Sequence, residues 1–116
     1  MSFFFTFFRK NNKSQNTTTY SNLVSLFDHV RDYVMNYKIP HMVYEETLDF
    51  FNSLSSRVEE NENAKRFYRQ QVEPIVNEFL SLIEKDGIQY VADVDYAIGL
   101  MEKILSKVKD LEEEYF

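Results

Sequence analysis

The side chains best suited to metal chemistry in this chain are two histidines, each followed by a carboxylate. Asp32 follows His29 by three residues, and Glu45 follows His41 by four. On a helix, either spacing places an imidazole and a carboxylate on one face. Zinc and di-iron sites need three or four such ligands, and a di-iron bundle uses Glu-x-x-His on two helices, a spacing that is absent here. We therefore expect no metal site, and a packing or solvated role for both histidines.

Neighbouring carboxylates are the candidates for acid-base chemistry. They occur as Glu45 with Glu46, Glu59 with Glu60, and Asp93 with Asp95. Acid-base catalysis needs two carboxyl groups in a dry cleft with different pKa values, whereas surface acids and helix caps need only solvent. The chain has two glycines and no cysteine, which excludes a glycine-rich phosphate loop and a cysteine nucleophile. We expect no catalytic residue, no cofactor and no enzyme activity.

A basic cluster with aromatic residues inside it lies near the middle of the chain. Lys65, Arg66 and Arg69 surround Phe67 and Tyr68. On a helix these two sets face different ways, so we expect the aromatic rings to enter the core and the cations to form a positive face. That face would pair with the acidic end of the last helix, remain solvated, or bind a partner.

The first ten residues are unusual because they combine a dense aromatic run with positive charge. The predicted partner-binding residues are Phe3, Phe4, Phe5, Phe7, Phe8, Arg9 and Lys10. Burial of one phenylalanine is worth about 1.5 to 3 kcal/mol, so some surface should cover these rings. Three alternatives remain for the surface that covers these rings: the chain's own bundle, a groove on another protein chain, or an anionic membrane surface that also attracts the cations.

Charge divides the chain into two parts. The first twenty residues hold three basic side chains and no acid, so they carry +3, and the remainder carries -9 of the net -6. An acidic body repels nucleic-acid phosphates, which disfavours nucleic acid as a partner. The positive charge follows the aromatic run, whereas a secretory signal places it first. We expect a protein of the cytoplasm or of a viral particle.

Scarcity of turn residues favours an all-α fold, since the chain has two glycines and two prolines. The apolar spacing predicts helices over 21–38, 41–59, 63–85 and 93–111. The polar residues 61–63 are a weak break, so the second and third helices could be continuous. Pro74 lies inside the third helix, where a kink is favoured over a new start.

Four positions carry helix-end signals. Thr19 or Ser21 is expected to cap the first helix, and Asp93 or Asp95 the last. Gly87 is expected in the left-handed position after the third helix.

The last helix has the clearest apolar stripe. Its core-facing positions are Val94, Ala97, Ile98, Met101, Ile104, Leu105, Val108 and Leu111. A stripe of that width is typical of a bundle helix. It would pack within this chain or form a homodimer through the C-terminal helix.

These patterns together predict an all-α antiparallel bundle of three to four helices, over 21–116, with a flexible aromatic and basic N-terminal arm and polar linker over 1–20. We expect a non-enzymatic interaction or structural protein that docks another protein chain through the arm. The A/T-rich codon usage that the composition implies suits a viral or phage accessory component. One alternative is a peripheral membrane protein that uses the same arm, and another is an acidic inhibitor that mimics nucleic acid.

Overall fold

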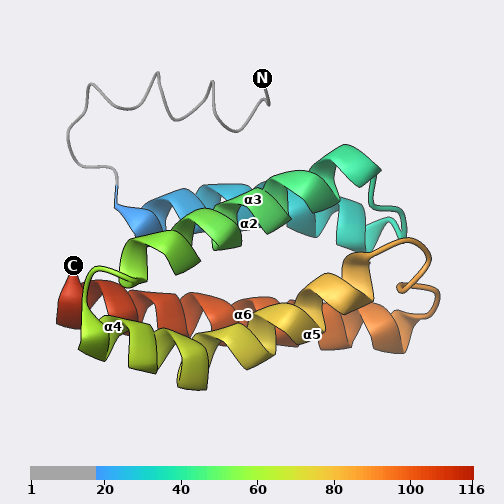
Figure 1. Cartoon of the computed structure of the whole chain (residues 1–116). Coiled ribbons are helices and arrows are strands. Elements are labelled where there is room, and N and C mark those ends of the chain that lie inside the picture. Colours follow the sequence, from blue (N-terminus) through green and yellow to red (C-terminus); the bar gives the residue numbers. More distant parts are fainter. Residues whose placement is uncertain (1–17) are drawn as a thin grey trace.

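The computed structural model describes residues 18–116, and every regular element in that part of the chain is a helix (Figure 1). The elements are α2 (Thr19–Met35), α3 (His41–Val58), α4 (Glu62–Phe67), η2 (Tyr68–Val72), α5 (Glu73–Ile83) and α6 (Val91–Tyr115). Since α4, η2 and α5 follow one another without a gap, the described chain forms four helical rods. The prediction of an all-α bundle is confirmed, and the predicted arm lies outside the described residues.

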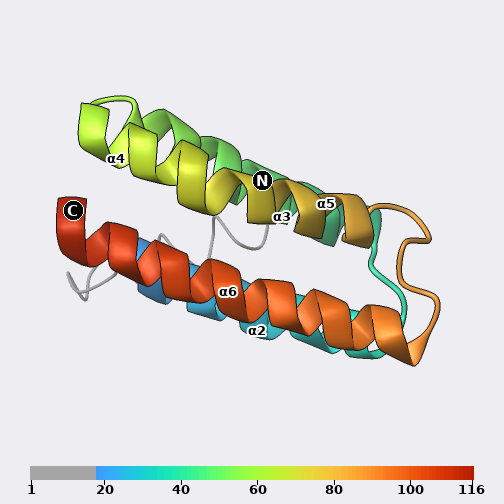
Figure 2. The same cartoon turned by 90° about the horizontal axis from the view of Figure 1, so that it is seen from below.

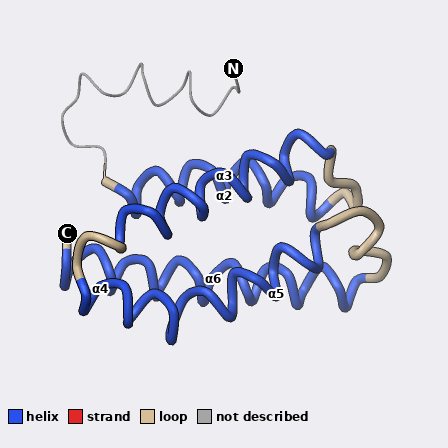
Figure 3. The backbone as a smooth tube through the Cα atoms, in the orientation of Figure 1, coloured by secondary structure: helices blue, strands red, loops and turns tan. Residues whose placement is uncertain are grey.

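Successive rods run in opposite directions and pack into a bundle. Figure 2 shows α6 beside α2, and the rod of α4, η2 and α5 beside α3. The short connections lie at the two ends of the bundle (Figure 3). We call the end with Thr18, residues 59–61 and Phe116 the arm end, and the end with residues 36–40 and 84–90 the loop end.

The first helix begins earlier than predicted, because Thr18 is its N-cap. The Thr18 hydroxyl accepts from the Ser21 N–H at 3.0 Å, and the Ser21 hydroxyl accepts from the Thr18 N–H at 2.9 Å. This reciprocal pair is a capping box, which satisfies two N–H groups that a helix start leaves open. Neither Thr19 nor Ser21 is therefore the N-cap, although Ser21 belongs to the cap.

The first helix also ends earlier than predicted, in a Schellman motif. The Lys38 N–H donates to the Tyr33 carbonyl and the Tyr37 N–H to the Val34 carbonyl, both at 3.1 Å. Tyr37 occupies the left-handed position of the motif with φ 64°, a place that glycine usually fills.

The second and third rods are separate helices, and Asn61 is the residue that divides them. Its side-chain oxygen accepts from the N–H groups of Asn63 at 2.9 Å and Ala64 at 3.1 Å. An asparagine that bonds to the backbone in this way starts a new helix instead of continuing the old one. The polar break predicted from the sequence is thus a real helix boundary.

Pro74 does not end the third rod, because a wide helical turn precedes it. The Glu73 N–H donates to the Tyr68 carbonyl five residues earlier, which makes η2 a π-helical turn. A proline in an α-helix lacks one N–H and its ring collides with the carbonyl group four residues before it. The wider turn relieves that collision, and the helix runs from Glu62 to Ile83.

The connection after α5 corrects the prediction for Gly87. Lys85, with φ 55°, takes the left-handed conformation there, and Gly87 has a negative φ. Gly87 is needed for a different reason, since a Cβ atom on it would lie 1.9 Å from the Leu82 carbonyl oxygen. The glycine allows the chain to pass close to the end of α5.

The last helix begins at Val91, and its predicted caps lie inside its first turns. The Asp93 carboxylate accepts from the N–H groups of Gln89 and Tyr90, each at 2.9 Å. Asp93 therefore stabilises the start of α6 from its third position and is not the N-cap residue itself. Asp95, two residues further along, is exposed.

All four rods contribute to one apolar core. Phe27 of α2 lies at its centre, with its ring centroid 5.5 Å from Phe79 of α5 and 6.2 Å from Phe51 of α3. On α6, six of the predicted core positions are buried: Val94, Ala97, Met101, Ile104, Val108 and Leu111. Ile98 and Leu105 are only partly buried, whereas Leu100, absent from the predicted stripe, is 4 % exposed. The stripe of α6 is thus covered within a single chain.

Candidate functional site

The arm end is the candidate site, because the chain enters the described part there at Thr18. The predicted partner-binding residues Phe3, Phe4, Phe5, Phe7, Phe8, Arg9 and Lys10 lie outside the described residues. What the structure shows is the surface from which that segment starts.

The first turn of α2 is tied to two other helices at the arm end. The Tyr20 N–H donates to Oε1 of Glu112 on α6 at 3.0 Å. The Thr19 hydroxyl accepts from Nη1 of Arg57 on α3 at 2.6 Å, and the guanidinium of Arg57 lies 3.9 Å from the centre of the Phe116 ring. These contacts fix the attachment point of the N-terminal segment against α3 and α6.

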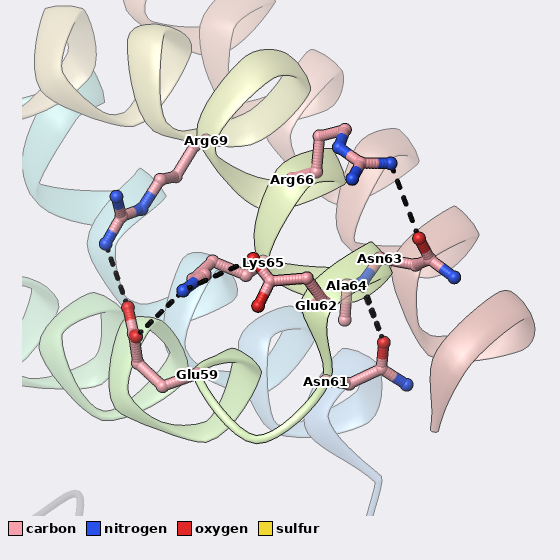
Figure 4. A network of polar contacts seen from close by, with 8 residues as sticks. All are labelled: Glu59, Asn61, Glu62, Asn63, Ala64, Lys65, Arg66 and Arg69. Carbon is pink, nitrogen blue, oxygen red and sulfur yellow. Dashed lines mark hydrogen bonds and ion pairs between the residues drawn. The ribbon is translucent and has the colours of Figure 1, made fainter.

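Two cations of the predicted basic cluster pair with acids at the connection between α3 and α4 (Figure 4). Lys65 Nζ lies 3.5 Å from Oε1 of Glu59 and 3.6 Å from Oε2 of Glu62. Arg69 Nη2 lies 2.9 Å from Oε2 of Glu59. Of the alternatives left open for this face, the structure shows pairing within the chain for these two residues, with acids other than those of the last helix. Glu59 and Glu62 are closer to these cations along the chain than the acids of the last helix are, and they are the residues that pair with them.

The third cation, Arg66, is directed elsewhere. Its Nη1 donates to the side-chain oxygen of Asn63 at 3.4 Å, on the same helix (Figure 4). Each cation of the cluster thus has a partner close by, in the connection between α3 and α4 or on α4 itself.

The two aromatic residues of the cluster turn inward, as predicted. Tyr68 is 2 % exposed, and its hydroxyl donates to the Phe51 carbonyl at 3.3 Å. Burial raises the pKa of Tyr68 well above its ordinary value, and the negative charge of Glu73 adds to the shift. Phe67 is partly buried, with its ring centroid 6.1 Å from that of Tyr115.

An open hollow of about 340 Å³ lies between α4 and the end of α6. We call it the acidic hollow, and it is lined by Phe67, Asp110, Glu113, Glu114 and Tyr115. Among residues 18–116, none of its three carboxylates forms a hydrogen bond or an ion pair. Sequence reasoning missed this site, although the i, i+3, i+4 spacing of the acids indicated a shared helix face.

The two histidines do not come together. His41 Nε2 lies 3.2 Å from Oε2 of Glu45, with both side chains exposed to solvent. The ring of His29 packs edge-on against Tyr33 with centroids 5.3 Å apart, in a different helix. Within the part of the chain that the structure describes, no three histidine, aspartate or glutamate side chains are placed to hold a metal ion.

The predicted carboxylate pairs have divergent surroundings. Glu45 is exposed while Glu46 is 4 % exposed, and Glu59 binds two cations while Glu60 is exposed. Asp93 caps α6. Each pair is thus divided between different environments.

Two further observations are not tied to a single site. No helix among the described residues has the length and apolar character that a bilayer crossing requires. Comparison with protein-family models, with curated proteins and with solved structures finds no match.

Proposed function

We propose that this chain is a non-enzymatic helical interaction protein that docks another protein chain through its Phe-rich N-terminal segment. The residues that would contact the partner are Phe3, Phe4, Phe5, Phe7, Phe8, Arg9 and Lys10. The observation that supports this proposal most is the anchored attachment point: Tyr20 and Thr19 bond to α6 and α3 directly beside the start of the segment. These contacts fix the point at the arm end from which the segment departs.

The segment's composition is the second support. Its five phenylalanines would each gain about 1.5 to 3 kcal/mol from a host groove. As a helix it would present Phe4, Phe7 and Phe8 on one face, and as a strand Phe3 and Phe5 with Phe7. We place the protein as an accessory or structural component of a larger assembly, and a viral or phage assembly suits its composition.

Site-specific photocrosslinking tests the proposal in the full chain. A benzophenone amino acid at Phe5 should crosslink to one partner protein in cells that express the chain, and mass spectrometry identifies it. The matched control carries the same group at Ser53, which is exposed on α3. The partner should appear with the first probe and not with the second.

A second variant separates the arm from the bundle. Serine in place of all five phenylalanines, with Arg9 and Lys10 retained, should abolish the crosslinked complex and leave the helical circular dichroism signal unchanged. Equal recovery of the partner with both probes would reject the arm as the docking element. Co-flotation with anionic vesicles that weakens with salt, in place of a protein partner, would assign the segment to a membrane surface.

A further inference from the structure

We infer that the connection between α3 and α4 is a hinge, and that its opening lets this chain pair with a second copy of itself. In the open form residues 41–83 make one continuous helix, and two copies exchange their α2–α3 halves. Each half then packs on the other copy as it packs within one chain in the closed form that the structure shows. The inference goes beyond the proposed function and does not depend on it.

Two of the three connections between the described rods hold the chain in a bend that a continuous helix cannot adopt. The connection after α2 has Tyr37 in the left-handed region and then Pro40. The connection after α5 has Lys85 in the left-handed region, and its Gly87 passes against the Leu82 carbonyl group. A left-handed residue and an internal proline each interrupt an α-helix, so neither connection can straighten without a large rearrangement.

The connection between α3 and α4 has none of these features. Residues 59–61 include no glycine, no proline and no positive φ. Glu59 already has α-helical angles, φ -60° and ψ -21°, and glutamate is a good helix former. Asn61 is extended, with φ -135° and ψ 115°. A change of backbone angles confined to this short stretch would therefore join α3 to α4 in one helix.

The buried faces of α3 and of the third rod are in phase across the hinge. Three pairs of buried residues are two heptads apart: Phe50 with Ala64, Leu54 with Tyr68, and Val58 with Val72. Residues at this spacing lie on nearly the same face of a helix. Straightening the hinge thus produces one continuous apolar stripe instead of two faces that point in different directions.

The α2–α3 half is held mainly by the other half of the bundle, α4–α6 (Figure 1). α2 packs more extensively on α6 than on α3, and α3 packs on α4 and α5. The Phe27 ring of α2 lies 5.5 Å from the Phe79 ring of α5, measured between centroids. The Tyr68 hydroxyl donates to the Phe51 carbonyl across the same boundary. Exchange between two copies therefore preserves the contacts on which the bundle depends.

Asn61 holds the hinge closed within one chain (Figure 4). Its side-chain oxygen accepts from the N–H groups of Asn63 at 2.9 Å and Ala64 at 3.1 Å. In a continuous helix those N–H groups would bond to the carbonyl groups four residues earlier, and the cap would be lost. Because opening exchanges one set of hydrogen bonds for another, a single substitution at Asn61 shifts the balance between the two forms.

Glu59 adds ion pairs that only the closed form makes within one chain. Its carboxylate lies 3.5 Å from Lys65 Nζ and 2.9 Å from Arg69 Nη2. In a continuous helix Lys65 and Arg69 would lie about 9 and 15 Å further along the axis. The contact of Lys65 with Glu62 spans three residues and remains in both forms. Ion pairs this exposed contribute little, so the cap is the main contact that opening removes.

The position of the hinge determines the shape of the dimer. Because residues 59–61 lie at the arm end, exchange joins two bundles through their arm ends. Both chains then enter their bundles, at Thr18, near the centre of the dimer. In dilute solution the closed form is favoured, since the two halves of one chain are at a higher effective concentration than the halves of two chains.

Refolding from denaturant at low and at high protein concentration tests the hinge in the full chain. Light scattering after size exclusion should show monomer at low concentration and a dimer fraction that grows with concentration. Asn61→Ala removes the cap, and each dimer contains two hinges, so the association constant should rise at least about tenfold. Physiological ionic strength screens the repulsion between two chains that each carry a net charge of -6.

Glu62→Pro is the opposing variant. It suits the closed form, because residue 62 is the first of α4 and Asn61 before it is extended, as a following proline requires. In a continuous helix the proline ring would collide with the Val58 carbonyl. Glu62→Pro and the double variant N61A/E62P should therefore stay monomeric at high concentration. Asn63→Ala makes the same side-chain change as Asn61→Ala at a position that is helical in both forms, and it should keep the wild-type dimer fraction.

Isotope-filtered nuclear magnetic resonance distinguishes exchange from simple association. In dimers refolded from a mixture of phenylalanine-labelled and unlabelled chains, the ring protons of Phe27 should contact those of Phe79 on the other copy. Two closed bundles that merely associate would keep this contact within each copy.

Four results would each overturn the inference. They are a wild type that refolds only as monomer at high concentration, an Asn61→Ala variant with no more dimer than Asn63→Ala, a Glu62→Pro variant with as much dimer as the wild type, and a Phe27 to Phe79 contact found only within a copy. Circular dichroism checks the helical content of every variant. Since N61A and N61A/E62P both lack the cap, a difference between them comes from the proline and not from lost stability.

Discussion

Tyr68 shows how one side chain serves both the core and the polar network of this bundle. Its ring is buried in the third rod, and its hydroxyl donates to the Phe51 carbonyl on the neighbouring helix at 3.3 Å. A buried phenolate would lose its hydration, and the nearby carboxylate of Glu73 would repel it, so the pKa is raised. The folded state therefore needs this hydroxyl in its protonated form.

Alkaline unfolding tests the state of Tyr68. Because the folded pKa lies above the unfolded value of about 10, the unfolded chain releases this proton first as pH rises. Above about pH 10 the free energy of unfolding should fall, by up to about 1.4 kcal/mol per pH unit from this residue. Tyr68→Phe removes that contribution and should flatten the alkaline slope measured by urea unfolding, while the lost hydrogen bond costs about 0.5 to 1.5 kcal/mol at neutral pH.

Tyr90→Phe is the matched control for this measurement, since the Tyr90 side chain is exposed. It should keep the wild-type slope. If Tyr68→Phe and Tyr90→Phe gave the same slope between pH 10 and 11, the burial of Tyr68 would not control the alkaline transition.

At the scale of the elements, the two connections at the loop end share one feature. Each contains a non-glycine residue in the left-handed region, Tyr37 after α2 and Lys85 after α5. Gly87, the glycine of the second connection, has a negative φ and provides space instead. A glycine can serve a turn by adopting a positive φ or by having no side chain. In this connection Lys85 has the positive φ, and Gly87 is the position with no room for a side chain.

Two substitutions in the connection after α5, one that removes its glycine and one that adds a glycine, test the roles of Gly87 and Lys85 separately. Gly87→Ala should lower the free energy of unfolding by about 1 to 3 kcal/mol, because a Cβ atom would overlap the Leu82 carbonyl and the backbone must shift. Lys85→Gly should raise it by up to about 1 kcal/mol, because glycine adopts a positive φ without strain. Chemical denaturation measures both values, and a destabilising Lys85→Gly together with a neutral Gly87→Ala would show that the residue roles are reversed.

The helices could be predicted from local sequence signals, whereas the residues that cap them mostly could not. Apolar spacing located all four rods, and Asn61 marked the break that separates two of them. The buried face of α3 was harder to predict, since its core side includes Thr47, whose hydroxyl donates to the Val43 carbonyl at 2.9 Å. A polar side chain that forms its hydrogen bond within its own helix can be buried, but the spacing of apolar residues does not predict its burial.

The candidate site was less predictable, because its walls come from distant parts of the chain. Phe67 and Tyr115 meet across the hollow only after the bundle has formed. The partners of Lys65 depend on the helix break, which places Glu59 within its reach. Sequence spacing indicates which residues share a helix face, but contact between two helices follows from how they pack.

At the scale of the whole molecule, α6 connects the two halves of the bundle. It lies beside α2 and beside α5, and its buried stripe faces both (Figure 2). The two ends differ in surface chemistry. The arm end carries the anchored attachment point and the acidic hollow, whereas Met35, Tyr37, Met42, Tyr90 and Val91 are exposed in or beside the connections of the loop end. Between these two ends, the buried residues of α6 pack against both halves of the bundle.

Neighbouring positions on α6 test that role. Ile104 is 0 % exposed, and Leu105 is only partly buried at the edge of the same stripe. Ile104→Ala should cost about 2 to 5 kcal/mol of the roughly 5 to 15 that such a domain has, and Leu105→Ala clearly less. Because α6 contacts both halves of the bundle, the loss should lower one cooperative transition, with circular dichroism and tyrosine fluorescence giving the same midpoint. A larger cost at Leu105 than at Ile104 would mean that α6 is rotated in the bundle, and two separate midpoints would mean that the halves unfold independently.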